Sequence, residues 1–201
     1  MAILDLLFPK KCLECGQSGK YICEDCLKKI PPGGWTNRET YSCFKYEGVI
    51  RKAIIALKYK YSTEIAKELA EVCVQKMLAI NYRPLAILAP VPLHWHRKNF
   101  RGFNQSEEVG KLVAKKMGWK FIPDLLIRKK YTTPQAQLTG IARRQNLRGV
   151  FVLSLNYPLS AVCYPLILFD DVLTTGSTLL EASKVLRVGG AKRILCLTIA
   201  K

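Results

Sequence analysis

The chain has 201 residues, of which 49% are hydrophobic and 23% charged, a composition that describes a globular protein and excludes an intrinsically disordered one. Its longest apolar runs, such as residues 85–91, are too short to cross a bilayer as a helix. The net charge of +17, from 32 Lys and Arg against 15 Asp and Glu, fits either a polyanionic ligand or a solubilising surface. Residues 1–9 are apolar but lack a basic segment and a small-residue cleavage site, so we expect no signal peptide and a cytoplasmic location.

Two Cys-x2-Cys pairs stand near the start of the chain, Cys12 with Cys15 and Cys23 with Cys26, and seven residues separate them. Each pair can place two thiolates on one turn, and two such turns close a tetrahedral Zn²⁺ site with Zn–S bonds of about 2.3 Å. A disulfide framework requires an oxidising compartment, which nothing in the sequence indicates, and a thioredoxin-like site needs one pair at a helix start after a strand. The pattern therefore predicts a structural zinc module, spanning residues 1–34, that serves folding and not catalysis.

A Pro-Pro-Gly-Gly break at residues 31–34 separates this module from a second predicted domain, residues 35–201. The spacing of apolar residues there predicts, in chain order, strand 41–46, helices 50–57 and 64–80, strand 85–91, a helix from the cap Ser106 to Gly118, strands 121–127, 149–155 and 165–169, helix 178–188 and strand 193–199. Strands that alternate with helices predict an α/β fold, with a mostly parallel sheet flanked by helices. Four single cysteines in apolar segments are expected to be buried: Cys43, Cys73, Cys163 and Cys196.

Residues 166–178, LILFDDVLTTGST, carry the most specific chemistry of the chain. The apolar run predicts a buried strand that delivers Asp170 and Asp171 to its C-terminal end, before a hydroxyl-rich turn and a helix N-terminus. The free N–H groups and dipole of that helix suit a phosphate, Gly176 lets the backbone approach it, and the acids can accept hydrogen bonds from ribose hydroxyls. The alternative is an ordinary strand, turn and helix with a solvated acid pair. No Walker-type Gly-Lys-Ser/Thr sequence follows at the needed spacing, which disfavours ATP-type phosphate binding.

The loop 90–105, PVPLHWHRKNFRGFNQ, is a second candidate element, because ligands of α/β sheets bind at the C-terminal ends of strands. Arg101 can present a guanidinium to an anion just before a helix N-terminus. His94 and His96, two residues apart with no third ligand, are more typical of a polar surface than of a metal site. Lys58, at the end of a predicted helix, is either a phosphate contact or a solvated helix end. Three aromatic residues of the loop either stack on a base or anchor the loop to the core: Trp95, Phe100 and Phe103.

Residues 166–178 resemble the phosphoribosyl-pyrophosphate loop of type I phosphoribosyltransferases. The combination of PVP at 90–92 and RGFNQ at 101–105 resembles the ComF family, bacterial competence-associated relatives of those enzymes. This second resemblance covers nearly the whole chain, including the four-cysteine module, residues 56–59 and the basic stretch 137–151. It implies a type I phosphoribosyltransferase-like sheet with a small, zinc-ribbon-like N-terminal module.

The resemblance also implies a set of ligand-binding residues. Asp170 and Asp171 would hold the ribose hydroxyls, and the 5-phosphate would lie against the turn that follows them: Val172, Leu173, Thr174, Thr175, Gly176, Ser177 and Thr178. Pyrophosphate would be bound by Arg101, Gly102, Asn104 and Gln105, with Lys58 as a further candidate. Residues 132–146 would form a mobile hood in which Arg143 and Arg144 close over the polyphosphate. The implied catalytic set is Asp170, Asp171 and Arg101, with Mg²⁺ bridging pyrophosphate and ribose hydroxyls.

These features lead to competing hypotheses of function. The first is a phosphoribosyltransferase with an unidentified acceptor that acts in DNA uptake during natural competence. The alternative is a single-stranded-DNA-binding competence protein that binds phosphoribosyl pyrophosphate without turnover, and a third is a regulator or scaffold with a vestigial site. Residues 73–105 and 126–168 contain no Asp or Glu, which suits a polyanion, whether pyrophosphate or DNA. Proteins of the competence machinery are further candidate partners.

Overall fold

The computed structural model describes residues 9–59, 62–93, 102–129, 149–157 and 163–201. Its helices and strands follow in this order: α2 (Glu24–Lys28), β1 (Pro32–Asn37), β2 (Thr40–Phe44), α3 (Gly48–Tyr59), α4 (Thr63–Ala79), β3 (Ile87–Pro90), α6 (Gln105–Met117), β4 (Lys120–Phe121), β5 (Leu126–Arg128), β6 (Phe151–Leu153), β7 (Leu166–Val172), α8 (Ser177–Val188) and β8 (Ile194–Ala200).

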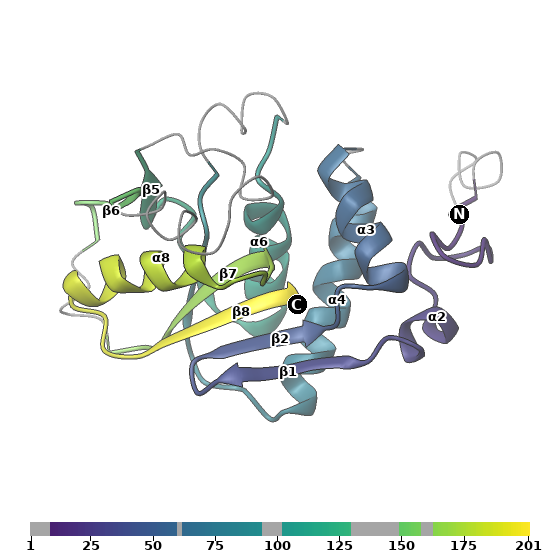
Figure 1. Cartoon of the computed structure of the whole chain (residues 1–201), viewed down its shortest axis with the longest axis horizontal. Helices are drawn as coiled ribbons and strands as arrows, with labels where there is room; N and C mark the ends of the chain where they lie inside the picture. The colour runs from purple at the N-terminus through teal and green to yellow at the C-terminus, as the bar shows by residue number, and fades with distance from the viewer. Residues whose placement is uncertain (1–8, 60–61, 94–101, 130–148, 158–162) are drawn as a thin grey trace.

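A six-stranded sheet forms the centre of the molecule, in the order β1-β2-β8-β7-β3-β4 (Figure 1). Only β1 is antiparallel to its neighbour, and the other neighbouring strands of this sheet are parallel. β5 and β6 form a separate antiparallel pair. The predicted α/β fold, with a mostly parallel sheet flanked by helices, is therefore confirmed.

Strand β7 is buried on both faces, which explains its continuous apolar run. Ile167 and Phe169 belong to the hydrophobic cluster under α3, α4 and α6, whereas Leu166 and Leu168 belong to the cluster under α8 and the β5–β6 pair (Figure 1). α6 lies directly on β7 at Gly110, where a Cβ atom would come within 3.2 Å of the Phe169 ring. This close approach brings the first turn of α6 to the C-terminal end of β7.

Two predicted elements differ from the observed ones. Residues 31–34 are more than a break, because β1 begins at Pro32 and pairs with β2. Gly33 is required there, since a Cβ atom would come within 2.4 Å of the Ser42 carbonyl oxygen. The predicted strand 121–127 divides at a turn over Pro123 into β4 and β5, which belong to different sheets.

Two side chains also differ from their predicted roles. The cap of α6 is Asn104 and not Ser106, because the Asn104 Oδ1 atom accepts from the Ser106 N–H at 3.2 Å. Cys163 is exposed just before β7, whereas the other three single cysteines are buried as predicted.

The cysteine-bearing segment packs against the start of α3 and α4. Its buried Ile22 and Ile30 share one hydrophobic cluster with these helices, and Ile30 contacts Gly48, the first residue of α3. The Glu68 carboxylate of α4 accepts from the backbone N–H groups of residues 21 and 22 at 3.2 and 2.7 Å. The segment is thereby fixed to the sheet-bearing part, and the domain boundary at residue 34 stays a prediction.

None of the helices in the described ranges is long and apolar enough to cross a membrane.

Candidate functional site

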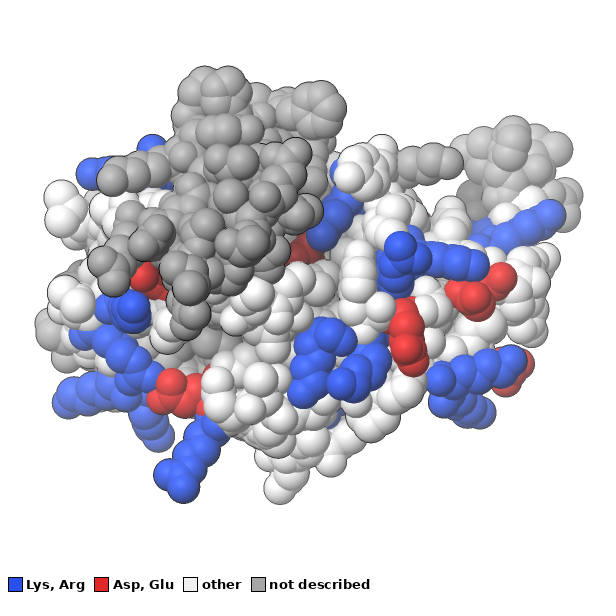
Figure 2. Space-filling model, viewed as in Figure 1, with Lys and Arg blue, Asp and Glu red and all other residues white. Residues whose placement is uncertain are grey.

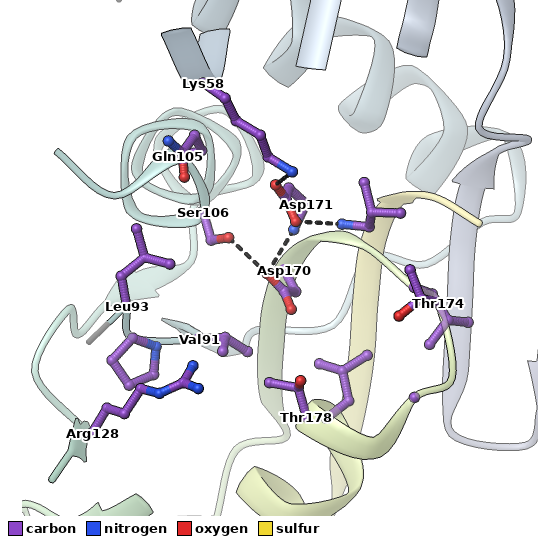
Figure 3. A pocket seen from close by; sticks show the side chains of 15 residues that line it. Lys58, Val91, Leu93, Gln105, Ser106, Arg128, Asp170, Asp171, Thr174 and Thr178 are labelled. Atoms are coloured by element: carbon purple, nitrogen blue, oxygen red, sulfur yellow. Dashed lines mark hydrogen bonds and ion pairs between the residues drawn. The ribbon is translucent and has the colours of Figure 1, made fainter. Parts of the chain in front are cut away.

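The C-terminal ends of β3 and β7 lie side by side, because these strands are adjacent and parallel. α6 and α8 begin at the same edge of the sheet, with their N-termini beside these strand ends. A pocket of about 220 Å³ opens here, and residues from α3, α6, α8, β5 and β7 line it (Figure 3). The predicted acid pair, the turn after it and Lys58 all lie on its wall.

Asp171 is held by an ion pair with Lys58, which comes from the last turn of α3. The Lys58 Nζ atom lies 2.6 Å from Asp171 Oδ2, and the two side chains are only 22% and 16% exposed. The other oxygen, Oδ1, accepts from the Val172 N–H at 2.7 Å. Because the pair is partly shielded from water, its attraction is stronger than that of a surface pair.

Asp170 is bound from α6. The Ser106 hydroxyl donates to Asp170 Oδ1 at 2.9 Å, and the Asp171 N–H donates to the same oxygen at 2.9 Å (Figure 3). Burial first, and then repulsion from the Asp171 carboxylate, raise the pKa of Asp170 to about 7, although the hydrogen bonds and Lys58 oppose the shift. The acid therefore changes charge near neutral pH, which is typical of a functional site.

The turn between β7 and α8 forms a third wall. Gly176 precedes the first residue of α8 with φ of 72°, a left-handed conformation that a side chain would strain. Thr174, Gly176 and Thr178 line the pocket. The hydroxyls of Thr175 and Ser177 bond each other at 3.0 Å and instead line a second hollow of about 610 Å³, between the turn, α8 and the β1–β2 hairpin.

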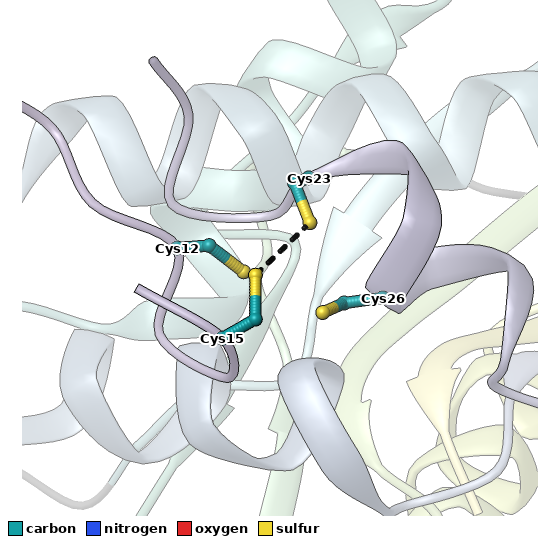
Figure 4. Close-up of side chains that lie close together, drawn as sticks. All are labelled: Cys12, Cys15, Cys23 and Cys26. Atoms are coloured by element: carbon teal, nitrogen blue, oxygen red, sulfur yellow. Dashed lines mark hydrogen bonds between the residues drawn. The ribbon is translucent and has the colours of Figure 1, made fainter. Parts of the chain in front are cut away.

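The four N-terminal cysteines converge, as Figure 4 shows. Their sulfur atoms all lie within 4.8 Å of one another, and those of Cys15 and Cys23 are 3.7 Å apart. A disulfide bond would bring two sulfurs to about 2.05 Å, whereas two thiolates on one tetrahedral Zn²⁺ lie about 3.8 Å apart. The cluster can thus hold a metal ion, and its spacing fits a four-thiolate site.

The protonation of the cluster also fits a cation. Burial raises the pKa of Cys12, but hydrogen bonds from the backbone N–H groups of Cys15 and Cys23 outweigh it and lower that pKa to about 6. Burial and the neighbouring sulfurs raise the pKa of Cys26 to about 12. The first thiolate forms readily, but its negative charge opposes ionisation of the other three cysteines. A bound divalent cation would offset this repulsion and stabilise four thiolates together.

Comparison with known proteins identifies the family. No family model matches the chain. It is 31% identical over 201 residues to DNA utilization protein YhgH of Salmonella typhimurium, covering 94% of this chain and 84% of that protein. It is likewise 31% identical over 204 residues to Competence protein F of Haemophilus influenzae, covering 91% and 81%. The chain belongs to the ComF family.

Solved structures similar to this ComF-family chain include phosphoribosyltransferases. The adenine phosphoribosyltransferase of Leishmania donovani has a TM-score of 0.41 at 18% identity, covering 86% of this chain and 64% of that one. The allosteric regulatory enzyme of purine biosynthesis has a TM-score of 0.46 at 16% identity, covering 72% of this chain and 30% of that one.

The loop predicted to bind pyrophosphate is only partly described in this ComF-family chain. Gly102 is exposed, and Gln105 is buried at the pocket. The Asn104 side chain serves the fold, because its Nδ2 atom donates to the Val91 carbonyl oxygen at 3.0 Å while Oδ1 caps α6. Phe103 packs on the core, as anchoring predicts. The remaining predicted residues of the loop and hood lie outside the described ranges: His94, Trp95, His96, Phe100, Arg101, Arg143 and Arg144.

Two residues of the pocket in this ComF-family chain, Ser106 and Arg128, are not predicted as site residues from the sequence. Ser106 resembles a helix cap in the sequence, and only the approach of α6 to β7 reveals its bond to Asp170. Arg128 is one of many basic residues in an acid-free window, and β5 places it on the pocket wall, with its guanidinium 5.5 Å from the centre of the Phe151 ring. No local signal distinguishes Arg128 from its basic neighbours.

Proposed function

We propose that this ComF-family protein binds phosphoribosyl pyrophosphate with Mg²⁺ and acts as a phosphoribosyltransferase-like protein, with an acceptor not identified by its sequence. The observation that carries the proposal is the acid pair at the C-terminal end of β7, beside a glycine-containing turn at the N-terminus of α8. A ribose 5-phosphate carries both the hydroxyl groups that carboxylates bind and the phosphate that a helix N-terminus binds.

Each part of the ligand has a candidate wall. The turn 172–178 suits the 5-phosphate, because its backbone N–H groups and the dipole of α8 favour an anion. Asp170 and Asp171 suit the ribose hydroxyls. Lys58, on the α3 side of the pocket, suits the pyrophosphate, together with Gln105 at the start of α6 (Figure 3). Gly102, Asn104, Arg101 and the hood arginines complete the set that the family resemblance implies.

The residues also fit a divalent cation beside such a ligand. When bound, Mg²⁺ would neutralise the pyrophosphate and stabilise its departure. The two adjacent carboxylates lower the electrostatic potential of the pocket, which favours entry of a polyphosphate together with its cation over entry of the bare anion. Lys58 and Arg128 add positive charge on opposite sides of the acids, where phosphate oxygens and an acceptor could be held (Figure 3).

The names of two relatives support a role in DNA uptake. Two similar proteins are called a DNA utilization protein and a competence protein, which supports the proposal that this chain acts in DNA uptake. The cytoplasm is its proposed location. Single-stranded DNA binding is the competing role, supported by the net charge of +17. On the face drawn in Figure 2, the basic side chains of the described residues form several separate groups. A continuous basic stripe, which could follow a DNA backbone, would support this role more strongly.

The four-cysteine cluster is proposed to hold structural Zn²⁺. Its ligand set is complete, with four sulfurs and no open coordination position, so the metal would stabilise the segment and take no part in chemistry. We retain the division into a module of residues 1–34 and a domain of residues 35–201 as part of this proposal.

Calorimetry with phosphoribosyl pyrophosphate and Mg²⁺ tests the proposed function on zinc-loaded protein. We expect saturable binding by the wild type and none by the Asp170→Asn/Asp171→Asn double variant, while pyrophosphate release in the presence of candidate acceptors would establish turnover. DNA binding should weaken steeply between about 50 and 200 mM salt, whereas the pocket contact should weaken less. Folded wild-type protein that does not bind phosphoribosyl pyrophosphate would refute the proposal and favour the DNA-binding role.

A further inference from the structure

The two acids of the pair are not equally open to a ligand. Both oxygens of Asp171 are occupied, Oδ1 by the Val172 N–H and Oδ2 by Lys58. Asp170 receives both of its donors on Oδ1, from the Ser106 hydroxyl and the Asp171 N–H. Among the described residues, Asp170 Oδ2 is thus the oxygen of the acid pair with no protein donor, which leaves its full capacity to accept hydrogen bonds for a ligand.

The orientation of Asp170 depends on Ser106, whose place in the fold is tightly determined. Ser106 is the second residue of α6 and only 4% exposed. Its backbone N–H donates to Asn104, whose side chain in turn donates to the carbonyl oxygen of Val91, the residue after β3. Gly110, one turn later, lies against β7. Since Asn104 caps the helix, the Ser106 hydroxyl is not needed for capping. Its contact is instead the carboxylate of Asp170.

We infer that Ser106 is a positioning residue, which turns the Asp170 carboxylate so that Oδ2 faces the ribose hydroxyls of the ligand. The inference rests on the proposed function and assigns its first ribose contact to Asp170, whose Oδ2 bears no donor among the described residues, whereas each oxygen of Asp171 already accepts one. Occupying one oxygen of a carboxylate with a fixed donor leaves the other as the acceptor, so the ligand meets a preorganised group.

The same hydrogen bond keeps Asp170 able to ionise. Of the residues that the structure describes, the charged ones that line the pocket with Asp170 are Asp171 on its own strand, Lys58 from α3 and Arg128 from β5, while α6 contributes the neutral Ser106. Burial and Asp171 raise the pKa of Asp170, and donation from the Ser106 hydroxyl opposes them by stabilising the carboxylate. Removal of the hydroxyl should therefore raise that pKa further and leave less of the charged acceptor at neutral pH.

The test compares Ser106→Ala, Ser106→Thr and the wild type for binding of phosphoribosyl pyrophosphate with Mg²⁺ between about pH 6 and 9. We expect Ser106→Ala to bind roughly tenfold more weakly at neutral pH, as for the loss of one hydrogen bond to a charged group. The midpoint of its pH profile should move up by about one unit, so that its deficit shrinks toward pH 9. Ser106→Thr keeps the hydroxyl and should bind nearly as the wild type. The matched control is Ser183→Ala, which removes a buried helical hydroxyl that contacts the Cys196 sulfur at 3.4 Å, and should not change the profile.

Titration of the Asp170 carboxyl carbon by NMR, in ligand-free protein, separates this inference from the proposed function. Ser106→Ala should raise the midpoint of Asp170 whether or not any ligand binds. An unchanged midpoint, a binding deficit that is equal at every pH, or a folded Ser106→Thr variant that binds as poorly as Ser106→Ala would overturn the positioning role. Wild-type protein without affinity for phosphoribosyl pyrophosphate would instead overturn the proposed function.

Discussion

Asp170 destabilises the folded protein at neutral and alkaline pH, and Asp170→Asn should remove this effect. Burial and the Asp171 carboxylate raise the pKa of Asp170 from 3.8 to about 7, so the folded protein retains a proton that the unfolded chain releases near its ordinary pKa. Stability therefore falls as pH rises between these two values and is constant above them. A shift of this size is worth at most about 4 kcal/mol, of which about 2 kcal/mol develops between about pH 5.5 and 8.5.

Urea unfolding of zinc-loaded wild type and Asp170→Asn, without ligand, measures this difference. The Asn side chain keeps an oxygen that accepts from Ser106 and from the Asp171 N–H, so the variant should gain stability over the wild type by up to about 2 kcal/mol more at pH 8.5 than at pH 5.5. Asp124→Asn changes an exposed acid and should differ little between the two pH values. An Asp170→Asn variant that is equally destabilised at both would refute the reasoning, because the carboxyl would then serve the fold in its charged form.

Three further predictions concern the pocket and the metal site. Lys58→Met leaves a shielded carboxylate without its cation and should lower the free energy of unfolding by about 1–3 kcal/mol in urea titrations. Lys52→Met, on the same helix but with a side chain that is 48% exposed, should lower it by less than about 1 kcal/mol. Equal losses in the two variants would contradict the importance of the shielded pair. Gly176→Ala and Gly149→Ala both force a side chain into a left-handed conformation, with φ of 72° and 64°, and should each cost about 1–2 kcal/mol. Only Gly176→Ala should also weaken ligand binding in calorimetry, and similar affinities for the two would count against the turn as the 5-phosphate site. Chelation should release one zinc ion per chain and lower the melting temperature by about 10 °C or more. Cys26→Ser should reproduce this loss, and added Zn²⁺ should restore the melting temperature of the chelated wild type but not that of the variant. A melting temperature insensitive to chelation would exclude structural zinc.

The features predicted well are those whose chemistry is contiguous in the chain. The acid pair, the turn after it and the start of α8 follow one another within 13 residues, so their local order already determines that they share a strand end and a helix N-terminus. The four cysteines form a similar case, because each pair needs only one turn to bring its sulfurs together.

Features that depend on packing between distant segments escape this reasoning. The bond from Ser106 to Asp170 joins residues 64 positions apart, and it requires the close approach of α6 to β7 at Gly110. β1 looks like a break because glycine and proline weaken strand propensity, yet Gly33 is what allows that strand to lie against β2. Arg128 lies on β5, which follows the turn at Pro123 and pairs with β6 in a separate sheet, so its place at the pocket depends on where that second sheet packs.

The position of α3 links the thiol chemistry of the N-terminal segment to the ligand pocket. The helix has 12 residues and is about 18 Å long, with Gly48 against Ile30 at one end and Lys58 against the acid pair at the other. Between these ends α3 buries Val49, Ile50, Ala53, Ile54 and Leu57 in the core, so the helix is held along its length. One helix therefore packs against the cysteine-bearing segment at its start and supplies at its end the fixed base from which Lys58 reaches the acid pair.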